Sequence, residues 1–391
     1  MLAAAVAVLL LALTHVYVWR RLVRDVTQRR RIRRAGAVAV TLLGVLVPAT
    51  LALSRTGKVE WIAWPGYLWL GLLFYLLLFL LALEVPRLVL LRWQRQAPRS
   101  DPEHASEPES AGVPDPSRRL AIGRGVALVT GLAATGTVGY GVRTALGPPV
   151  LDRRQIALPR LPRSMDGTRL VVVSDIHLSP LIGKAHVSRI VERINQLDAD
   201  VVAIVGDLVD GSVADRGADA EPLARIRSRH GAYFVTGNHD YYSGADAWIG
   251  RLDELGVRTL RNERTELLLR GGALDLAGVN DLTGAEHHDA PDFAKTFADR
   301  DPNRPVVLMA HQPVQAHQAA RYGVDLQVSG HTHGGQMAPF GLLARLEQPV
   351  VSGFGNVDGV PVYVTNGAGF WGPPVRVGAP PQVTLLQLRS P

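Results

Sequence analysis

The chain has 391 residues, a formal net charge of +7 and no cysteine, so disulfides and thiolate metal sites are excluded. The positive charge belongs entirely to the first 151 residues, which hold 18 Lys and Arg against 8 Asp and Glu, whereas the remainder holds 24 against 27. These arginines flank apolar segments, a pattern typical of membrane topology, and we therefore expect no nucleic-acid partner.

Four apolar stretches in the first half are each long enough to cross a bilayer, which requires about 20 residues. They cover residues 2–19, 35–53, 61–83 and 125–142. The first has the length of a signal peptide but lacks a basic start and a small-residue cleavage site, so we expect a retained span. No Asp, Glu, Lys or Arg lies within these stretches, which predicts an anchor rather than a transporter.

The loops between these stretches predict an orientation. Arginines are concentrated in the first and third loops, whereas the second carries only Arg55 and Lys58. By the positive-inside rule the arginine-rich loops are cytoplasmic, and everything after the fourth span lies outside. Residues 96–116, rich in Pro, Ser and Glu, predict a disordered cytoplasmic loop. We therefore expect a multi-pass anchor in the cell membrane over residues 1–146 and an extracytoplasmic domain over residues 152–391.

Five polar clusters follow apolar, β-branched runs in the second half. The runs at residues 170–174, 201–205, 233–236, 306–309 and 326–329 are typical of buried parallel strands. The clusters are Asp175-Ile176-His177, Gly206-Asp207-Leu208-Val209-Asp210, Gly237-Asn238-His239-Asp240, Met309-Ala310-His311 and Gly330-His331-Thr332-His333-Gly334. Ligands at the carboxyl ends of neighbouring strands converge on one crevice. Seven oxygen and nitrogen ligands are enough for two metal ions, so a two-metal hydrolase is the first hypothesis.

The order and spacing of these clusters resemble those of the calcineurin-like metallophosphoesterases, whose pattern is D-x-H, G-D-x-x-D, G-N-H-D/E, a lone His and G-H-x-H. The resemblance covers residues 170–336 and, with Gly334-Gly335-Gln336 and the anchor, is similar to a membrane-anchored bacterial branch. It implies an α/β fold, a four-layer sandwich of two mixed β-sheets flanked by helices, preceded here by an all-α membrane domain of about four transmembrane helices. The runs at 266–269, 273–278, 361–365 and 383–388 would supply the second sheet.

The resemblance also implies a role for each polar residue. Asp175, His177 and His333 would hold a first divalent ion, and Asn238, His311 and His331 a second, with Asp207 bridging the two. The ions would be Mn, Fe or Zn, among which the ligand types do not choose. His239, oriented by Asp210, would be the catalytic histidine near the leaving-group oxygen. Arg376, beside Phe370-Trp371, is a candidate substrate clamp, with an ordinary loop arginine as the alternative.

These roles predict a reaction and a class of substrate. Two cations lower the pKa of a bridging water, and the resulting metal-bound hydroxide would attack phosphorus. Because anchoring concentrates the site at the lipid surface, we expect phosphodiester or pyrophosphate bonds of a lipid-linked or cell-envelope substrate. The alternatives are a broad-specificity phosphomonoesterase and a catalytically silent membrane sensor or scaffold. Retention of all seven ligand positions argues against the silent protein.

Overall fold

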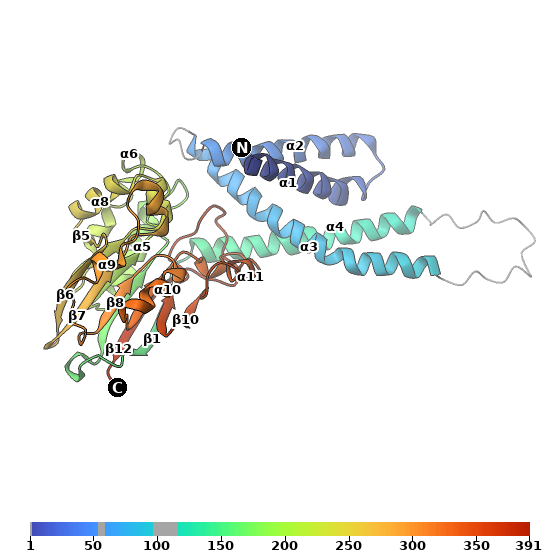
Figure 1. Cartoon of the computed structure of the whole chain (residues 1–391). Helices are drawn as coiled ribbons and strands as arrows, with labels where there is room; N and C mark the ends of the chain where they lie inside the picture. Colours follow the sequence, from blue (N-terminus) through green and yellow to red (C-terminus); the bar gives the residue numbers. More distant parts are fainter. Residues whose placement is uncertain (1, 54–58, 97–115) are drawn as a thin grey trace, which may run out of the picture. The chain divides into compact units, whose positions relative to one another are not determined.

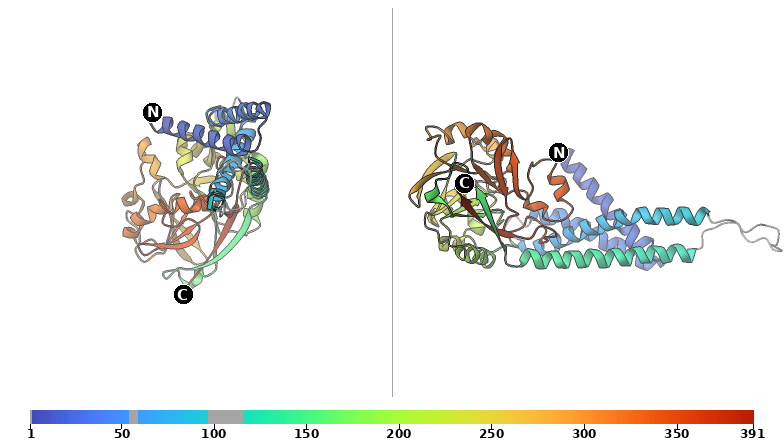
Figure 2. Two further views of the ribbon diagram at one scale, coloured as in Figure 1. Left: turned by 90° about the vertical axis from the view of Figure 1, so that its right-hand side faces the viewer. Right: turned by 90° about the horizontal axis from the view of Figure 1, so that it is seen from below.

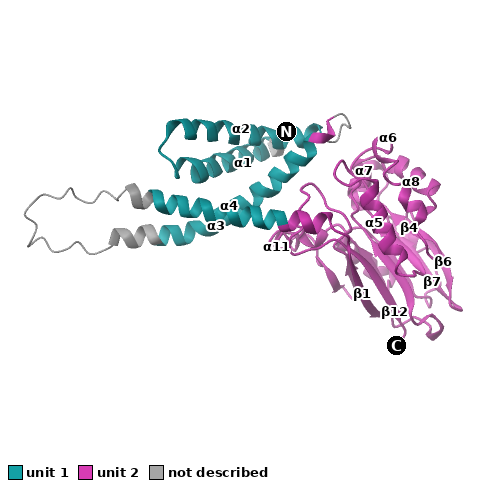
Figure 3. Ribbon diagram, turned by 180° about the vertical axis from the view of Figure 1, so that it is seen from behind, with its two compact units in different colours: residues 1–53, 62–139 teal, residues 54–61, 140–391 magenta. Residues whose placement is uncertain are grey.

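The computed structural model describes residues 2–53, 59–96 and 116–391 (Figure 1). The chain divides into two compact units. The first comprises Met1–Leu53 and Ile62–Gly139, and the second comprises Ser54–Trp61 and Tyr140–Pro391 (Figure 3). The loop that we expect to be disordered at 96–116 falls almost entirely on residues 97–115, which lie outside the described residues.

The first unit consists of long apolar helices. They are α1 (Leu2–Trp19), which continues as a π-helical turn at Arg20–Arg24, α2 (Arg30–Leu53), α3 (Ala63–Gln96, preceded by a 3₁₀ turn at Glu60–Ile62) and most of α4 (Pro116–Leu146). Among the described residues, four helical segments are long and apolar enough to cross a membrane: Ala5–Arg24, Arg30–Leu53, Glu60–Val89 and Leu120–Leu146. Each overlaps one of the apolar stretches expected from the sequence.

One carboxylate of the first unit, that of Glu84, is paired with several polar side chains. Glu84 lies within the third of these helical segments, whereas the sequence placed it at the edge of a shorter span. Its carboxylate accepts a hydrogen bond from the Tyr17 hydroxyl at 2.7 Å and forms ion pairs with Arg21 and Arg87. A carboxylate within an apolar helix is tolerated when it is paired in this way, and here the pairing joins α1 to α3.

The second unit is built on two sheets, each with six strands within the described residues (Figure 1). The first has the order β1 (Val150–Ala157), β12 (Gln382–Arg389), β2 (Thr168–Val173), β3 (Val201–Val205), β4 (Ala232–Val235) and β5 (Val257–Thr259). The second has the order β10 (Gly353–Val357), β11 (Val360–Val364), β9 (Leu326–Ser329), β8 (Val306–Met309), β7 (Gly272–Gly278) and β6 (Glu263–Leu269). Both are mixed, because β12 is antiparallel to β2 and because β10 and β6 are antiparallel to their neighbours.

Three buried clusters separate four layers. Alternate residues of a strand point to opposite faces, so Leu170 and Val172 pack between the sheets while Val171 and Val173 pack outward. The outward face of the first sheet is covered by α5 (Lys184–Asn195) and α8 (Ala245–Glu254), and that of the second by α9 (Phe293–Thr296) and α10 (Ala316–Ala319) (Figure 2). The expected sandwich of two mixed sheets flanked by helices is confirmed.

Shorter elements complete the second unit. They are α6 (Val213–Arg216), α7 (Asn238–Tyr242), α11 (Gly341–Ala344) and 3₁₀ turns at Arg163–Met165, Glu221–Arg225, Leu282–His287, Pro313–Gln315, Ala320–Tyr322 and His333–Gly335.

The assignment of one run to the second sheet was wrong. The run at residues 383–388 forms β12, which lies in the first sheet between β1 and β2. Conversely, two of the five buried parallel strands, β8 and β9, belong to the second sheet. Hydrophobic periodicity predicts that a segment is a strand but does not name its partner, because pairing depends on contacts distant in the sequence. In β12, for example, Gln382 pairs with Val150.

Candidate metal centre

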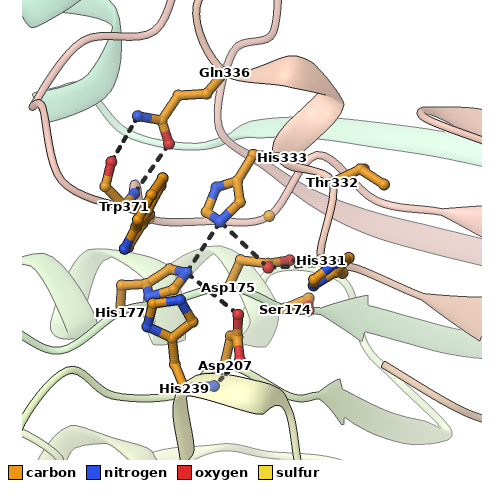
Figure 4. Close-up of polar contacts among 12 residues, drawn as sticks. Ser174, Asp175, His177, Asp207, His239, His331, Thr332, His333, Gln336 and Trp371 are labelled. Atoms are coloured by element: carbon orange, nitrogen blue, oxygen red, sulfur yellow. Dashed lines mark hydrogen bonds and ion pairs between the residues drawn. The ribbon is translucent and has the colours of Figure 1, made fainter. Parts of the chain in front are cut away.

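Each of the five polar clusters begins where a strand ends. Three clusters follow β2, β3 and β4 of the first sheet, and two follow β8 and β9 of the second. The carboxyl ends of strands from both sheets therefore supply the site. Figure 4 shows side chains from both sheets pointing toward one another.

A first group of possible metal ligands contains Asp175, His177 and His333. Their ligand atoms all lie within 4.8 Å of one another, and all three residues are buried. His333 Nε2 lies 3.0 Å from His177 Nε2 and 3.4 Å from Asp175 Oδ1 (Figure 4). These three side chains are those that the resemblance assigns to a first ion.

A second group contains Asp207, His311 and His331, again with ligand atoms within 4.8 Å of one another. Asn238 extends this group, because its Oδ1 lies 3.1 Å from His331 Nδ1. Asp207 Oδ2 lies 3.2 Å from His311 Nε2 and 3.7 Å from His177 Nε2. The Asp207 carboxylate is therefore between the two groups, where a bridging ligand would have to be.

The backbone at these positions is held in an uncommon conformation. The φ angles of Asp175, His177, Asp207, His331 and His333 are 52°, 50°, 50°, 70° and 51°. Positive φ is sparsely populated by residues other than glycine and clusters at functional sites, where the surrounding structure enforces it. Gly237 belongs to the same tightly packed region, since a Cβ atom built there would overlap Asp207 Oδ1.

The hydrogen bonding of His311 indicates a place for a cation. Its Nδ1 donates to the Val205 carbonyl at 2.7 Å, which leaves the lone pair on Nε2. Nε2 is buried, has no hydrogen-bond partner among the described residues, and faces the Asp207 carboxylate at 3.2 Å. Burial lowers the pKa of His311, but Asp207 outweighs burial and raises it well above its usual range. Two acceptors that face each other require a proton or a metal ion between them, and imidazole with carboxylate oxygen suits Mn, Fe or Zn.

Asp210 connects the first group to His239. Its two carboxylate oxygens accept from His177 Nδ1 at 3.2 Å and from His239 Nδ1 at 2.5 Å. Burial lowers the pKa of His177, but the charge and hydrogen bond of Asp210 outweigh it and raise the pKa to about 9. His177, Asp210 and His239 could by themselves hold an ion. However, because Asp210 occupies the Nδ1 side of both rings, His177 Nε2 faces the first group, as is usual for a histidine ligand fixed by a carboxylate.

Comparison with known proteins identifies the family. Residues 168–335 match the calcineurin-like phosphoesterase family. A Bos taurus protein called "transmembrane protein with metallophosphoesterase domain" is 32% identical over 397 residues, which cover 97% of this chain and 87% of the relative. The chain belongs to the calcineurin-like metallophosphoesterases.

Further relatives of this metallophosphoesterase occur in fish and in bacteria. The Danio rerio protein of the same description is 38% identical over 261 residues, which cover 64% of this chain and 60% of the relative. An uncharacterized metallophosphoesterase of Helicobacter pylori is 36% identical over 276 residues, covering 70% and 73% respectively. Membership of this family makes the chain a phosphoesterase hydrolase and associates its histidine and aspartate groups with divalent metals.

Arg376 does not have the geometry of a substrate clamp in this metallophosphoesterase. The side chain is fully buried, and its guanidinium donates to the carbonyls of Gly369, His333, Asn366 and Ala379 at 2.5–3.2 Å. A guanidinium that is occupied by backbone carbonyls has no free face for a phosphoryl group. Arg376 is instead a positioning residue that joins the His333 loop to the loop before Trp371. The sequence did not reveal this, because a loop arginine carries no signal of burial.

Arg376 also affects the proton on His333. Its Nη2 lies 3.1 Å from His333 Nδ1, so it favours the form of the ring that carries a proton on Nε2. That proton lies on the 3.0 Å contact with His177 Nε2. Burial and the charge of Arg376 hold the pKa of His333 well below its usual range, so the ring is neutral. For His333 to bind a metal ion through Nε2, this proton must leave.

Two further residues order the site, although no role for them was predicted from the sequence. The Asp240 carboxylate accepts from the backbone amides of Asp207, Leu208 and Gly237 at 2.7–2.9 Å, so it fixes two ligand loops together. Burial, followed by the charge of Asp207, raises the pKa of Asp240 to about 7. Gln336 donates to the Trp371 carbonyl and accepts from its amide, at 2.8 and 3.0 Å. Both residues lie inside the recognised motifs, and their position there was the only available signal.

Proposed function

We propose that the protein is a membrane-anchored, dinuclear-metal phosphoesterase that hydrolyses phosphodiester or pyrophosphate bonds of lipid-linked or cell-envelope substrates. The observation that carries the proposal is the place of Asp207 between two groups of buried ligands. In this proposal Asp175, His177 and His333 hold one divalent ion. The other is held by Asn238, His311 and His331, with Asp207 shared between the two.

The chain's own residues position the substrate and supply a proton. Two bound divalent cations neutralise phosphoryl oxygens and activate a water molecule. Because His239 Nδ1 is bonded to Asp210, its Nε2 is left to face the substrate. His239 would donate a proton from Nε2 to the departing oxygen, and Asp210 would hold the ring and stabilise its cationic form. The rings of Tyr242 and Trp371, with centroids 5.5 and 5.9 Å from that of His239, limit the directions from which a leaving group can approach.

The membrane part of the proposal is supported by four apolar helices and by relatives named as transmembrane proteins. In the proposal these helices form a multi-pass anchor in the cell membrane, with the arginine-rich loops in the cytoplasm and the second unit outside. Reporter fusions after residues 60, 105 and 391 test this arrangement. An extracytoplasmic signal is expected at 60 and 391 and a cytoplasmic one at 105, and a cytoplasmic signal at 391 would contradict the orientation.

The catalytic part is tested on the full chain reconstituted in lipid nanodiscs, with bound metal measured alongside hydrolysis. We expect two divalent ions per chain and a higher kcat/KM for bis-p-nitrophenyl phosphate than for p-nitrophenyl phosphate. Asp207→Asn should lower kcat by about a hundredfold or more, equivalent to about 2.7 kcal/mol of transition-state stabilisation. The exposed Asp253 supplies the matched control, and Asp253→Asn should leave kcat unchanged. Full activity of Asp207→Asn would remove the shared-ligand role, and a preference for the monoester would contradict the assignment to diesters.

A further inference from the structure

An exposed apolar surface lies directly after the metal-ligand loop of β9. It consists of Phe340, Leu342, Leu343 and Leu346, in and beside α11, and is called here the α11 surface. The exposed fractions of these four residues are 48%, 65%, 56% and 81%. Single exposed leucines are ordinary, whereas four large apolar side chains within seven residues are typical of a contact surface.

The α11 surface is fixed relative to the candidate metal centre. Only six residues separate Phe340 from His333. Gly335, at the end of the ligand loop, packs so closely on the start of α11 that a Cβ atom added to it would overlap Gly341 Cα. At the far end of the segment, Gln348 Oε1 accepts from the Val314 amide at 3.0 Å. The four apolar side chains are therefore held outward beside the site.

The last residues of α4 lie next to the segment that leads into α11. Residues Tyr140–Leu146 of α4 belong to the second unit. The Gly141 carbonyl of α4 accepts a hydrogen bond from the Arg376 amide at 3.0 Å. The carbonyl of Val377, which follows Arg376 in the chain, accepts from the Ala338 amide at 2.9 Å. The segment before α11 is therefore linked to the end of α4 through Arg376 and Val377.

The same end of α4 packs on the loop that carries Trp371. Ala145 forms a buried apolar cluster with Ile182 and Phe370, the residue before Trp371. Leu146 is also the last residue of the fourth segment that is apolar enough to span a membrane. A helix that leaves the bilayer here would bring the α11 surface and the rim of the site to the lipid boundary. Exposed aromatic side chains such as Tyr140 and Trp371 are typical of that boundary.

We propose that the α11 surface inserts into the lipid interface, so that a phosphoester on a lipid headgroup reaches the metal centre without leaving the membrane surface. This inference rests on the proposed function, in which α4 crosses the bilayer. The occupant is lipid, because the segment that leads into α11 is linked through Arg376 and Val377 to the end of α4, which is apolar enough to span a membrane. Insertion of apolar side chains beside a basic residue, here Arg345, is the usual mode of interfacial attachment.

The absence of cysteine allows a direct test. An environment-sensitive fluorophore is attached to Leu343→Cys or Leu346→Cys in the full chain in nanodiscs, with and without nitroxide-labelled acyl chains. Leu268→Cys is the matched control, because Leu268 is 70% exposed in β6 of the same unit. We expect emission from positions 343 and 346 to shift to shorter wavelength and to fall at least about twofold with the quencher, as for groups buried at the acyl boundary. Position 268 should show neither change.

Two results would overturn the inference. Emission at 343 and 346 equal to that at 268 would place the α11 surface in water. A shift to shorter wavelength without quenching by the labelled lipid would show that a protein surface, such as a second copy of the chain, covers it. Because the fluorescence measurement requires no turnover, it can refute insertion of the α11 surface whether or not the protein hydrolyses phosphoesters.

A second measurement asks whether insertion serves catalysis. It compares hydrolysis of a diacylglycerol p-nitrophenyl phosphodiester in the nanodisc with hydrolysis of soluble bis-p-nitrophenyl phosphate. The double substitution Leu343→Gln with Leu346→Gln should lower the rate on the lipid diester, divided by the rate on the soluble diester, by about tenfold, because two apolar anchors are lost. Leu268→Gln should leave the ratio unchanged. An unchanged ratio in the double variant would refute delivery of substrate along the membrane.

Discussion

Replacing Asp210 by asparagine should leave only one of two histidines with a hydrogen-bond acceptor at its Nδ1, because the carboxylate now accepts from both rings. Asp210 offers an oxygen to His177 Nδ1 and another to His239 Nδ1. Burial raises the pKa of Asp210, but the charges and hydrogen bonds of His177 and His239 outweigh it and hold the pKa below its usual range. The carboxylate is therefore ionised at neutral pH and stabilises positive charge on either ring.

The size of the effect follows from counting these hydrogen bonds. An asparagine of nearly the same shape has one acceptor oxygen, so it can serve one ring, while its amide nitrogen faces the N–H of the other. A hydrogen bond to a charged group contributes about 1.5–3 kcal/mol. Loss of one such bond and weakening of the other should raise the barrier by about 3 kcal/mol, which lowers kcat by about 10²-fold.

The assay compares aryl diesters whose leaving groups differ in basicity. p-Nitrophenolate departs readily without a proton, whereas phenolate needs one, so loss of a general acid slows diphenyl phosphate more than bis-p-nitrophenyl phosphate. We expect Asp210→Asn and His239→Ala each to increase, by about tenfold, the rate for bis-p-nitrophenyl phosphate divided by the rate for diphenyl phosphate. Bound metal is measured in every preparation. Asp253→Asn is the control.

Three outcomes bear on this reasoning. A rate for Asp210→Asn close to that of the unaltered protein would refute it. An equal loss for both esters with full metal content would show that His239 is not the general acid. If metal content falls instead, the ring that lost its partner is His177, and the effect operates through the first group of ligands.

Three other substitutions test separate features. Gly237→Ala should abolish most activity and reduce metal content, because the new Cβ would overlap Asp207 Oδ1; activity within twofold of the unaltered protein would contradict the packing. Arg376→Met should lower the free energy of unfolding by about 3–5 kcal/mol, measured by denaturant titration, because buried carbonyls lose their donor. A large loss of substrate affinity without loss of stability would instead support the role of Arg376 as a substrate clamp.

Asp200→Asn should cost about 1–2 kcal/mol of stability at pH 7 with kcat unchanged, because Asp200 accepts from the Arg169 amide and Arg229 at the start of β3. Burial raises the pKa of Asp200, but these partners outweigh it and lower the pKa. The folded chain then binds fewer protons than the unfolded chain. The stabilisation is complete above about pH 4 and is lost as pH falls through the folded pKa. Unfolding curves between pH 3 and 7 should therefore converge for the two proteins at low pH, and parallel curves would contradict the assignment.

The sequence alone determined which segments are strands and which residues follow them. A buried run such as Val201–Val205 ends at Gly206-Asp207 in the structure as in the pattern, because β-branched residues favour strands and a polar cluster stops the buried run. The four apolar helices were also readable, since a span long enough for a bilayer is a local property.

Only the tertiary structure decided how these segments combine. The pattern could not show that β8 and β9 stand in a second sheet, or that β12 is inserted between β1 and β2. It could not show that the Arg376 guanidinium is enclosed by carbonyls, or that Arg376 and Val377 link the end of α4 to the segment before α11. A local sequence specifies local conformation and burial pattern, whereas strand partners and side-chain environments arise from contacts between residues far apart in the chain.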